Sequence, residues 1–455
     1  MQPPTVKIIG ESRVAAPATA ALPPEPISLS ALDAQWVTLP LIQRVLIFAF
    51  ADAGGVAAPP FSPAVAALRA SLADTLARFP TLGGRVVHLA ATSDAAIDCA
   101  AGGGVRFVVA EAEDADAARL AGDEDHDAEA FQALVPGLDA GTLPAEAMAA
   151  QATRLNGGGI ALGVAMHHAV VDGRSVWAFL QAWAAACRGD VWAGEPPTFD
   201  RAVIRLPGGD ELARDVLRKY APDLPVATVA GHLIRPNLSR RTFTITAQHM
   251  RRLKHRVAAA GLLSPAQGDG ATTPSSFVAV AALAWVSFVR AKHAAGVVAS
   301  AADEVYLFFF ADCRARLDPA PGERYFGTCI SGCMARAAAG DLLAEGGLGA
   351  AAAAVAAEVR RAAEDPLAGW DWMGTVEGVD MDRLVHLAGS TRFPAYEAAD
   401  FGWGPPSRTE LVTMNHDGQV VLVAGKGGDG GVQASVSLHP AHMDDYKSHF
   451  IGYIT

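Results

Sequence analysis

Two residues that could do proton-transfer chemistry lie close together in the first half of the chain. His168 and Asp172 are four residues apart, Gly173 follows, and the apolar run Ile160 to Met166 precedes them. Two adjacent valines and the glycine disfavour a helix here and favour a strand end followed by a turn. We therefore expect a strand that delivers His168 to a loop, with a helix from about Ser175 to Cys187. An imidazole held in this way can act as a general base.

Asp172, four residues after His168, could have either of two roles. Its carboxylate could orient the imidazole, as in a serine-protease triad, or it could point away and pair with a buried arginine. His167 precedes the candidate base on a strand, so its side chain faces the opposite way and we interpret it as structural. A lone histidine is more often structural than catalytic, and a second motif, Asp400 to Gly404, favours the catalytic interpretation here.

Length and composition restrict the class of protein. A chain of 455 residues is too long for one core and predicts two domains. The net charge of -12 and the pI near 5.5 argue against a nucleic-acid binder and give no reason to expect a membrane partner. The first ten residues lack the apolar segment of a signal peptide, and the run Phe277 to Val289 is too short to cross a bilayer. We therefore expect a cytoplasmic protein.

The five cysteines have no regular spacing, which is typical of reduced thiols in a cytosolic enzyme. Cys329 and Cys333 could hold half a metal site, but no second pair of ligands lies near them in the sequence. We therefore interpret both as small core residues and expect no metal.

Strands and helices alternate in both halves, so the predicted class is α/β. The proline-rich, charged segment 196–236 is interpreted as a crossover linker between domains at 1–195 and 237–455. The acidic stretch 111–129 is expected to be a solvated loop or surface helix. Strands are expected at 7–9, 43–50, 85–90, 241–245, 305–310, 420–423 and 432–438, and helices at 63–79, 211–220, 247–259, 275–293 and, interrupted near Gly346, 342–363.

Four motifs together resemble a known family. They are His-x-x-x-Asp-Gly at 168–173, Asp-Cys-Arg-Ala-Arg-Leu at 312–317, Tyr-Phe-Gly-Thr-Cys at 325–329 and Asp-Phe-Gly-Trp-Gly at 400–404. In this order and spacing they resemble the plant BAHD acyl-CoA-dependent acyltransferases. The third motif is similar to the branch that acylates anthocyanin and phenolic glucosides, often with malonyl-CoA. Thr328 stands where that branch has asparagine, and Pro405 where it usually has a basic residue.

The resemblance implies a two-domain α/β sandwich like chloramphenicol acetyltransferase, with a channel between the domains and the histidine midway along it. Part of 365–400 could pack with the N-terminal domain. The resemblance also implies that Asp172 is structural and pairs with Arg314, or failing that with Arg316. Asp400 and Gly402 would shape a tight loop. The indole N–H of Trp403 could donate to the developing oxyanion, with backbone amides as the competing donors.

Several side chains could bind the donor. Arg251, Arg252 and Lys254 share one basic helix that could meet the CoA phosphates, or that could simply be a solvated face. Thr273, Ser275 and Ser276 precede a buried helix, where they offer amide donors for an anion or serve only as its cap. A malonyl carboxylate would need a cation, for which Arg174 and Arg392 are candidates. A hydroxycinnamoyl donor would need an apolar slot instead.

The leading hypothesis is therefore an acyl-CoA-dependent O-acyltransferase that acts on a hydroxyl of a flavonoid, anthocyanin or other phenolic glucoside. Malonyl-CoA is the favoured co-substrate, His168 is the general base, and neither a covalent intermediate nor a permanently bound cofactor is expected. One alternative uses a hydroxycinnamoyl or acetyl donor, or an amine acceptor. A hydrolase is disfavoured because no Gly-x-Ser-x-Gly motif is present, and a non-catalytic relative because His168 is retained. The chain shows no heptad pattern, so we expect a monomer.

Overall fold

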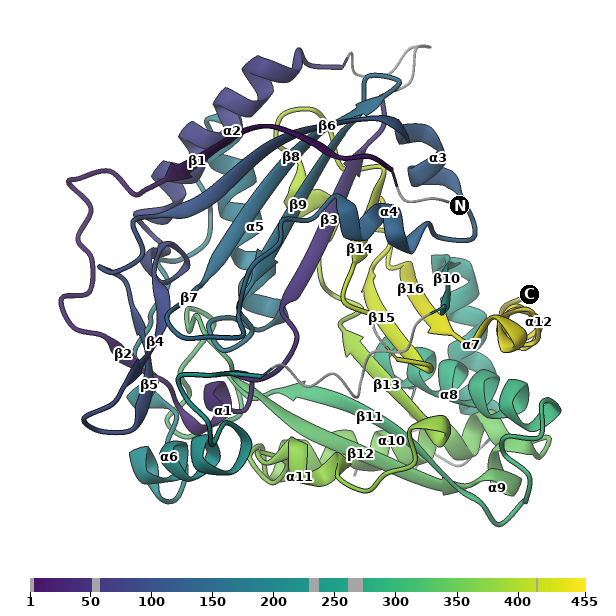
Figure 1. The fold of residues 1–455 in the computed structure, drawn as a ribbon. Coiled ribbons are helices and arrows are strands. Elements are labelled where there is room, and N and C mark those ends of the chain that lie inside the picture. The colour runs from purple at the N-terminus through teal and green to yellow at the C-terminus, as the bar shows by residue number, and fades with distance from the viewer. Residues whose placement is uncertain (1–3, 51–57, 229–236, 261–272, 415) are drawn as a thin grey trace. The chain divides into compact units, whose positions relative to one another are not determined.

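The computed structural model describes residues 4–50, 58–228, 237–260, 273–414 and 416–455, which form two compact units (Figure 1). Unit 1 comprises Met1–Gly231, Leu317–Cys329 and Ala395–Thr413. Unit 2 comprises His232–Arg316, Ile330–Pro394 and Met414–Thr455. Each unit combines helices with its own β-sheet, so the α/β class predicted from the sequence is confirmed. Two segments of the second half of the chain belong to unit 1.

The main sheet of unit 1 has six strands in the order β1-β6-β8-β9-β3-β14. Its pairs are antiparallel except for β6 and β8. The last strand comes from the late segment 395–413 and pairs with β3. The strand bounds are β1 Lys7–Val14, β3 Ile42–Phe48, β6 Val105–Asp116, β8 Met148–Asn156, β9 Ile160–Met166 and β14 Arg408–Leu411.

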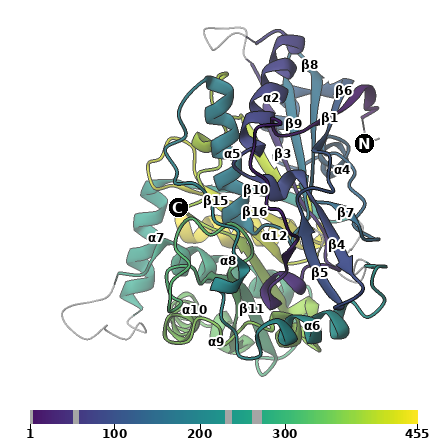
Figure 2. The same cartoon turned by 90° about the vertical axis from the view of Figure 1, so that its left-hand side faces the viewer.

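Helices cover both faces of this sheet (Figures 1 and 2). Helices α2 (Phe61–Leu76) and α5 (Gly173–Arg188) pack against each other beside one face. Two short helices, α3 (Ala117–Gly122) and α4 (Ala128–Ala133), share a core cluster with Val45 and Ile47 of β3 on the other. Strand β9 is an inner strand of this sheet, with helices over both faces, and all seven of its residues are buried. A continuous apolar strand of this kind is expected where both faces are covered.

The rest of unit 1 is built from short elements. A small sheet has the order β2-β5-β4-β7, with bounds β2 Ile27–Ser28, β4 Arg85–Leu89, β5 Asp94–Asp98 and β7 Ala145–Glu146. The remaining helices are α1 Ala31–Ala34 and α6 Gly209–Tyr220, with the 3-10 turns η1 Pro80–Gly83, η2 Arg201–Val203 and η5 Glu397–Ala399.

Unit 2 has a six-stranded sheet in the order β10-β16-β15-β13-β11-β12. Its strands are β10 Ser239–Ile245, β11 Glu304–Asp312, β12 Ile330–Ala338, β13 Leu384–Gly389, β15 Gln419–Ala424 and β16 Val432–Leu438. Its helices are α7 Ala247–Ala259, α8 Ser276–Ala294, α9 Ala339–Leu343, α10 Gly347–Glu364, α11 Trp372–Val376 and α12 Pro440–Ile454, with the 3-10 turn η4 Met381–Arg383.

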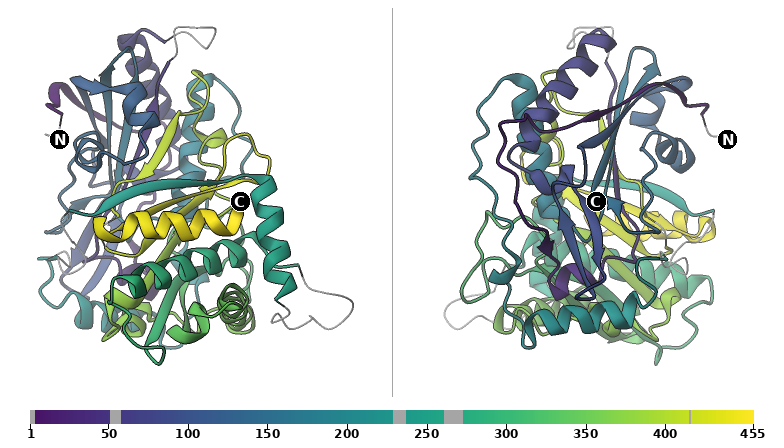
Figure 3. Two further views of the ribbon diagram at one scale, coloured as in Figure 1. Left: turned by 90° about the vertical axis from the view of Figure 1, so that its right-hand side faces the viewer. Right: turned by 60° about the vertical axis from the view of Figure 1, so that its left-hand side comes forward.

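Helix α8 is the centre of the unit 2 core. It packs against α10 and α12, and Figure 3 (left) shows α8 and the yellow α12 side by side. Among the described helices α8 alone is long and apolar enough to span a membrane, but 78% of its apolar window is buried inside the unit. A helix buried to this extent is part of the protein core. The apolar run Phe277 to Val289, which is too short to cross a bilayer, agrees with this.

The first part of the acidic stretch 111–129 departs from the prediction of a loop or surface helix, whereas its second part includes the helix α3. The first part, Glu111 to Asp116, continues strand β6 rather than forming a loop. Within it Ala112 and Ala115 are buried and Glu113 is exposed, so the apolar positions that define the strand are small alanines among charges. Alanine has little β propensity, so the residue types at 111–116 do not predict a strand.

Candidate active site

The loop after β9 is a tight turn that is held by its own backbone and by His167. The His167 side chain is fully buried, and its Nδ1 accepts a hydrogen bond from the amide of Ala169 at 3.2 Å. The His167 carbonyl accepts from the amide of Val170 at 2.9 Å, while its amide donates to the Ala147 carbonyl of the neighbouring chain segment. Burial lowers the pKa of His167 to about 4, so this ring is neutral and structural.

His168 stands at this turn with a partly exposed side chain. The indole of Trp36 lies flat against its imidazole, with ring centroids 3.6 Å apart and planes inclined by 9°. Burial lowers the pKa of His168 to about 4, against smaller opposing effects of its own backbone and of the nearby Asp172 carboxylate. The ring is therefore neutral at physiological pH, which is the form that can accept a proton.

Asp172 serves as the N-cap of α5. Its Oδ1 accepts from the amide of Ser175 at 3.0 Å, and its Oδ2 accepts from the amide of Cys329 at 3.2 Å. The Nδ1 atom of His168 has no hydrogen-bond partner among the described residues, so the triad arrangement is not formed. The expected partner Arg314 belongs to unit 2, where it is 1% exposed and contacts Asp312 at 3.2 Å. Because Asp172 and Arg314 belong to different units, their pairing stays a prediction.

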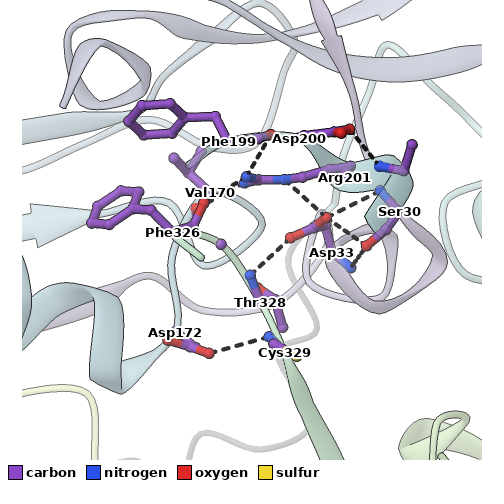
Figure 4. Close-up of polar contacts among 12 residues, drawn as sticks. Ser30, Asp33, Val170, Asp172, Phe199, Asp200, Arg201, Phe326, Thr328 and Cys329 are labelled. Atoms are coloured by element: carbon purple, nitrogen blue, oxygen red, sulfur yellow. Dashed lines mark hydrogen bonds and ion pairs between the residues drawn. The ribbon is translucent and has the colours of Figure 1, made fainter. Parts of the chain in front are cut away.

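The Tyr-Phe-Gly-Thr-Cys motif lies beside the His168 loop within unit 1. The Ser175 hydroxyl lies 3.2 Å from both the amide nitrogen and the carbonyl oxygen of Gly327. The Thr328 hydroxyl donates to the carbonyl of His168 at 3.3 Å, and the Thr328 amide donates to Asp33 at 3.0 Å. Figure 4 shows Thr328 and Cys329 between two carboxylates, Asp33 and Asp172.

Three residues of this site were missed from the sequence: Asp33, Trp36 and Arg201. Asp33 was discoverable in principle, because it is a single charge within an apolar stretch and completes a capping box with Ser30. Arg201 lies in the segment interpreted as a linker, where one arginine among several charges carries no distinguishing signal. That segment holds η2 and α6, and its described residues belong to unit 1.

The Asp-Phe-Gly-Trp-Gly motif forms a second tight turn in unit 1. The Oδ1 atom of Asp400 accepts from the amides of Gly402 at 2.8 Å and Gly404 at 3.0 Å. Both glycines have positive φ angles, +99° and +83°, which explains why glycine is needed there. Arg188, at the end of α5, donates to the Asp400 carbonyl. Phe401 is 1% exposed.

The same turn places Trp403 away from His168. Its ring centroid lies 5.3 Å from that of Phe48, and Phe48 pairs with Ile160 at the start of β9. The strand from Ile160 to Met166 spans about 20 Å, and His168 follows at its far end. We therefore correct the expected oxyanion role of Trp403 to a packing role at the opposite end of β9.

The residues expected to bind the donor all lie in the described part of the chain, and their role in binding stays a prediction. Arg252 of α7 donates to the Thr455 carbonyl at 3.3 Å, whereas Arg251 is exposed and Lys254 half-buried. The Ser275 hydroxyl caps α8 by accepting from Val278 at 3.2 Å. Arg174 forms an ion pair with Glu323. Thr273 is exposed, Ser276 is the first residue of α8, and Arg392 is exposed.

The site therefore has a neutral histidine in a turn after a buried strand, and no described residue forms a hydrogen bond with its Nδ1 atom. A family model described as "Transferase family" matches residues 5–452. The chain belongs to this family, that of the BAHD acyltransferases, and the resemblance carried by the four motifs is confirmed.

Curated relatives cover nearly the whole chain at low identity. "Phenolic glucoside malonyltransferase 1" of Arabidopsis thaliana is 28% identical over 440 residues, which are 92% of this chain and 91% of that protein. "Malonyl-CoA:anthocyanidin 5-O-glucoside-6''-O-malonyltransferase" of the same plant is 27% identical, covering 93% of each. "Agmatine coumaroyltransferase", again from Arabidopsis thaliana, is 26% identical and covers 99% of each.

Solved structures share the fold at still lower identity. Vinorine synthase has a TM-score of 0.73 and 18% identity, covering 99% of this chain and 98% of that one. F. graminearum TRI101, complexed with coenzyme A and T-2 mycotoxin, has a TM-score of 0.68 and 16% identity, covering 93% and 97%. These likenesses support the two-domain α/β acyltransferase fold.

Proposed function

We propose that this acyltransferase moves an acyl group from acyl-CoA to a hydroxyl of a phenolic glucoside, with malonyl-CoA as the favoured donor and His168 as the general base. The observation that carries the proposal is the neutral, partly exposed imidazole of His168, stacked on Trp36 at the turn after β9. The names of the malonyltransferase relatives support the choice of donor and acceptor.

The reaction needs no covalent intermediate, because a thioester is already an activated acyl donor. His168 would take the proton from the acceptor hydroxyl as its oxygen attacks the thioester carbonyl. The carbon–sulfur bond then breaks, and the imidazolium returns the proton to the leaving thiolate. A pKa near 4 keeps the ring neutral before reaction, while making it a weaker base than an ordinary histidine.

An aromatic donor, a hydroxycinnamoyl-CoA, is the second candidate. Unit 2 carries an aromatic cluster on the sheet: the rings of Phe308 and Phe310 are 5.0 Å apart, and Trp372 lies 5.3 Å from Phe310. His386 of the adjacent strand lies 5.6 Å from Phe308. Most of this cluster is buried, with Phe308 2% and Trp372 9% exposed, so the support for an aromatic donor comes from the name of the coumaroyltransferase relative. Arg174, one cation proposed for a malonyl carboxylate, already pairs with Glu323.

A comparison of reaction rates with different acyl-CoA donors distinguishes the malonyl donor from the aromatic donor. Malonyl-CoA, coumaroyl-CoA and acetyl-CoA would each be incubated with the protein and a panel of phenolic glucosides, and free thiol would be followed with time. The proposal expects thiol release that depends on the acceptor and is fastest with malonyl-CoA. Fastest release with coumaroyl-CoA would favour the aromatic donor, and release with water alone would indicate a hydrolase. Agmatine in the panel tests an amine acceptor.

A further inference from the structure

We infer that Asp33, Arg201 and Thr328 are positioning residues that clamp the His168 loop and thereby hold the imidazole against Trp36. The inference rests on the proposed role of His168 as the base. The three residues come from α1, η2 and the Tyr-Phe-Gly-Thr-Cys segment, and all belong to unit 1. None of them needs to touch a substrate to hold the loop in place.

Two carbonyls of the loop accept hydrogen bonds from this clamp. The Thr328 hydroxyl donates to the carbonyl of His168 at 3.3 Å, and Nη2 of Arg201 donates to the carbonyl of Val170 at 3.3 Å. These carbonyls flank Ala169, so the loop is held on both sides of one residue. A turn fixed at both points holds the Cα–Cβ bond of His168 in one direction, and the imidazole then stacks on the ring of Trp36.

Asp33 and Arg201 are linked to each other and to Thr328 (Figure 4). Oδ1 of Asp33 accepts from the Thr328 amide at 3.0 Å, and its Oδ2 lies 3.4 Å from Nε of Arg201. Nη1 of Arg201 donates to the carbonyl of Phe326 at 2.5 Å. A Cβ atom added at Gly327 would lie 2.6 Å from Cζ of Arg201, so a larger residue there would require the guanidinium to move.

Burial of the Asp33–Arg201 ion pair removes both charges from water, which costs free energy of solvation. Asp33 is 0% and Arg201 6% exposed. A buried ion pair contributes little net stability, because desolvation offsets the attraction, and its better-supported use is to specify one arrangement of the chain. Here the arrangement specified is the contact between the motif segment and the loop that carries His168.

The same segment that carries Asp33 also brings Trp36 onto the imidazole. Ser30 and Asp33 form a capping box that begins α1, and Trp36 follows two residues after the helix ends. One local structure therefore supplies both an anchor for Thr328 and the ring on which His168 stacks. Within the described residues of unit 1, His167 and Asp172 lie near His168, and the Asp33–Arg201 pair lies beyond Thr328.

Thr328→Val tests the clamp with the smallest change, because it removes the hydroxyl and keeps the shape and the backbone amide. We expect kcat to fall by on the order of 10- to 100-fold, since a small misplacement of a reacting group has effects of this size, with the KM for acyl-CoA changed by less than about twofold. The imidazole resonances of His168, followed by NMR of histidine-labelled protein, should lose the ring-current shift of Trp36. Thr328→Ser should restore both.

Thr75→Val is the matched control. Thr75 is also buried, at 3% exposed, and its hydroxyl donates to a backbone carbonyl, that of Ser71 at 2.7 Å within α2. It should lower stability comparably while leaving kcat and the His168 resonances as in the parent protein. Asp33→Asn is a second variant, which keeps an acceptor for Thr328 but removes the charge facing Arg201, and it should move kcat and the resonances as Thr328→Val does.

Folded Thr328→Val and Asp33→Asn proteins with parental kcat and parental His168 resonances would overturn the clamp. The NMR readout needs no turnover, so it separates the two hypotheses. If His168→Asn stays active while Thr328→Val moves the resonances, the base assignment is wrong and the clamp stands. If His168→Asn is inactive and Thr328→Val changes nothing, the base stands and the clamp is wrong.

Discussion

The two motif turns of unit 1, at 168–173 and 400–404, look equally functional in the sequence but differ in structure. The first exposes part of an imidazole, and a second ring lies flat against it. The second directs Phe401 into the core, 5.3 Å from the ring of Trp183 on α5. Helix α5 begins at the first turn and ends where Arg188 holds the second. A characteristic motif can therefore either expose a titratable ring or bury an aromatic one, and only the surroundings in the folded unit distinguish the two.

Replacing the candidate base should have the largest effect on activity. His168→Asn removes the proton acceptor and keeps the approximate size of the side chain, so kcat/KM should fall about 10²- to 10⁴-fold. Thermal unfolding should move little, because the His168 side chain is partly exposed and its Nδ1 has no hydrogen-bond partner among the described residues. Near-parental turnover would remove His168 from the mechanism.

Truncating the second turn should affect stability instead. Phe401→Ala leaves a cavity beside Trp183 and Phe48 and should lower the free energy of unfolding by about 3–5 kcal/mol. Denaturant unfolding measures this loss, and activity per folded molecule should be retained at low temperature. A folded Phe401→Ala protein with the activity loss of His168→Asn would show that both turns serve the reaction.

The pH dependence of kcat/KM distinguishes Trp36, which stacks on His168, from Trp403, which belongs to the second turn. Catalysis requires neutral His168, so kcat/KM should fall as pH drops through the lowered pKa, near 4. Trp36→Leu lets water reach the imidazole, which weakens the burial effect and raises this pKa towards its ordinary value of about 6.5. The acid limb should therefore move to higher pH.

Trp403→Leu is the control for this shift, because Trp403 packs at the other end of β9. Its acid limb should coincide with that of the parent protein. A limb displaced equally in both variants would mean that the Trp403 turn communicates with His168, contrary to its position in the structure.

The smallest effect is expected for Arg188→Ala. This change removes the hydrogen bond that the guanidinium donates to the Asp400 carbonyl, and it should lower the free energy of unfolding by about 1 kcal/mol. Calorimetry of the purified variant measures the change. Parental stability would show that the internal hydrogen bonds of Asp400 suffice to hold the turn.

Patterns in the sequence predicted much of the framework. Helix α7 has the bounds expected for it, and the strands expected at 420–423 and 432–438 are found as β15 and β16, which pair antiparallel. The alanine-rich region is two helices, α9 and α10, separated near the expected Gly346. Pairing of β14 with β3 could not be predicted, because the two strands are more than 350 residues apart and a short strand carries no sign of its partner.

The sequence by itself determined that His168 follows a buried strand and precedes a helix, because apolar runs, turn glycines and capping aspartates act over a few neighbouring residues. Only the tertiary structure decided what surrounds the imidazole. Trp36, Arg201 and Thr328 reach it or its loop from three distant parts of the chain. Their contacts depend on how the whole of unit 1 packs, and no local pattern of residues records that packing.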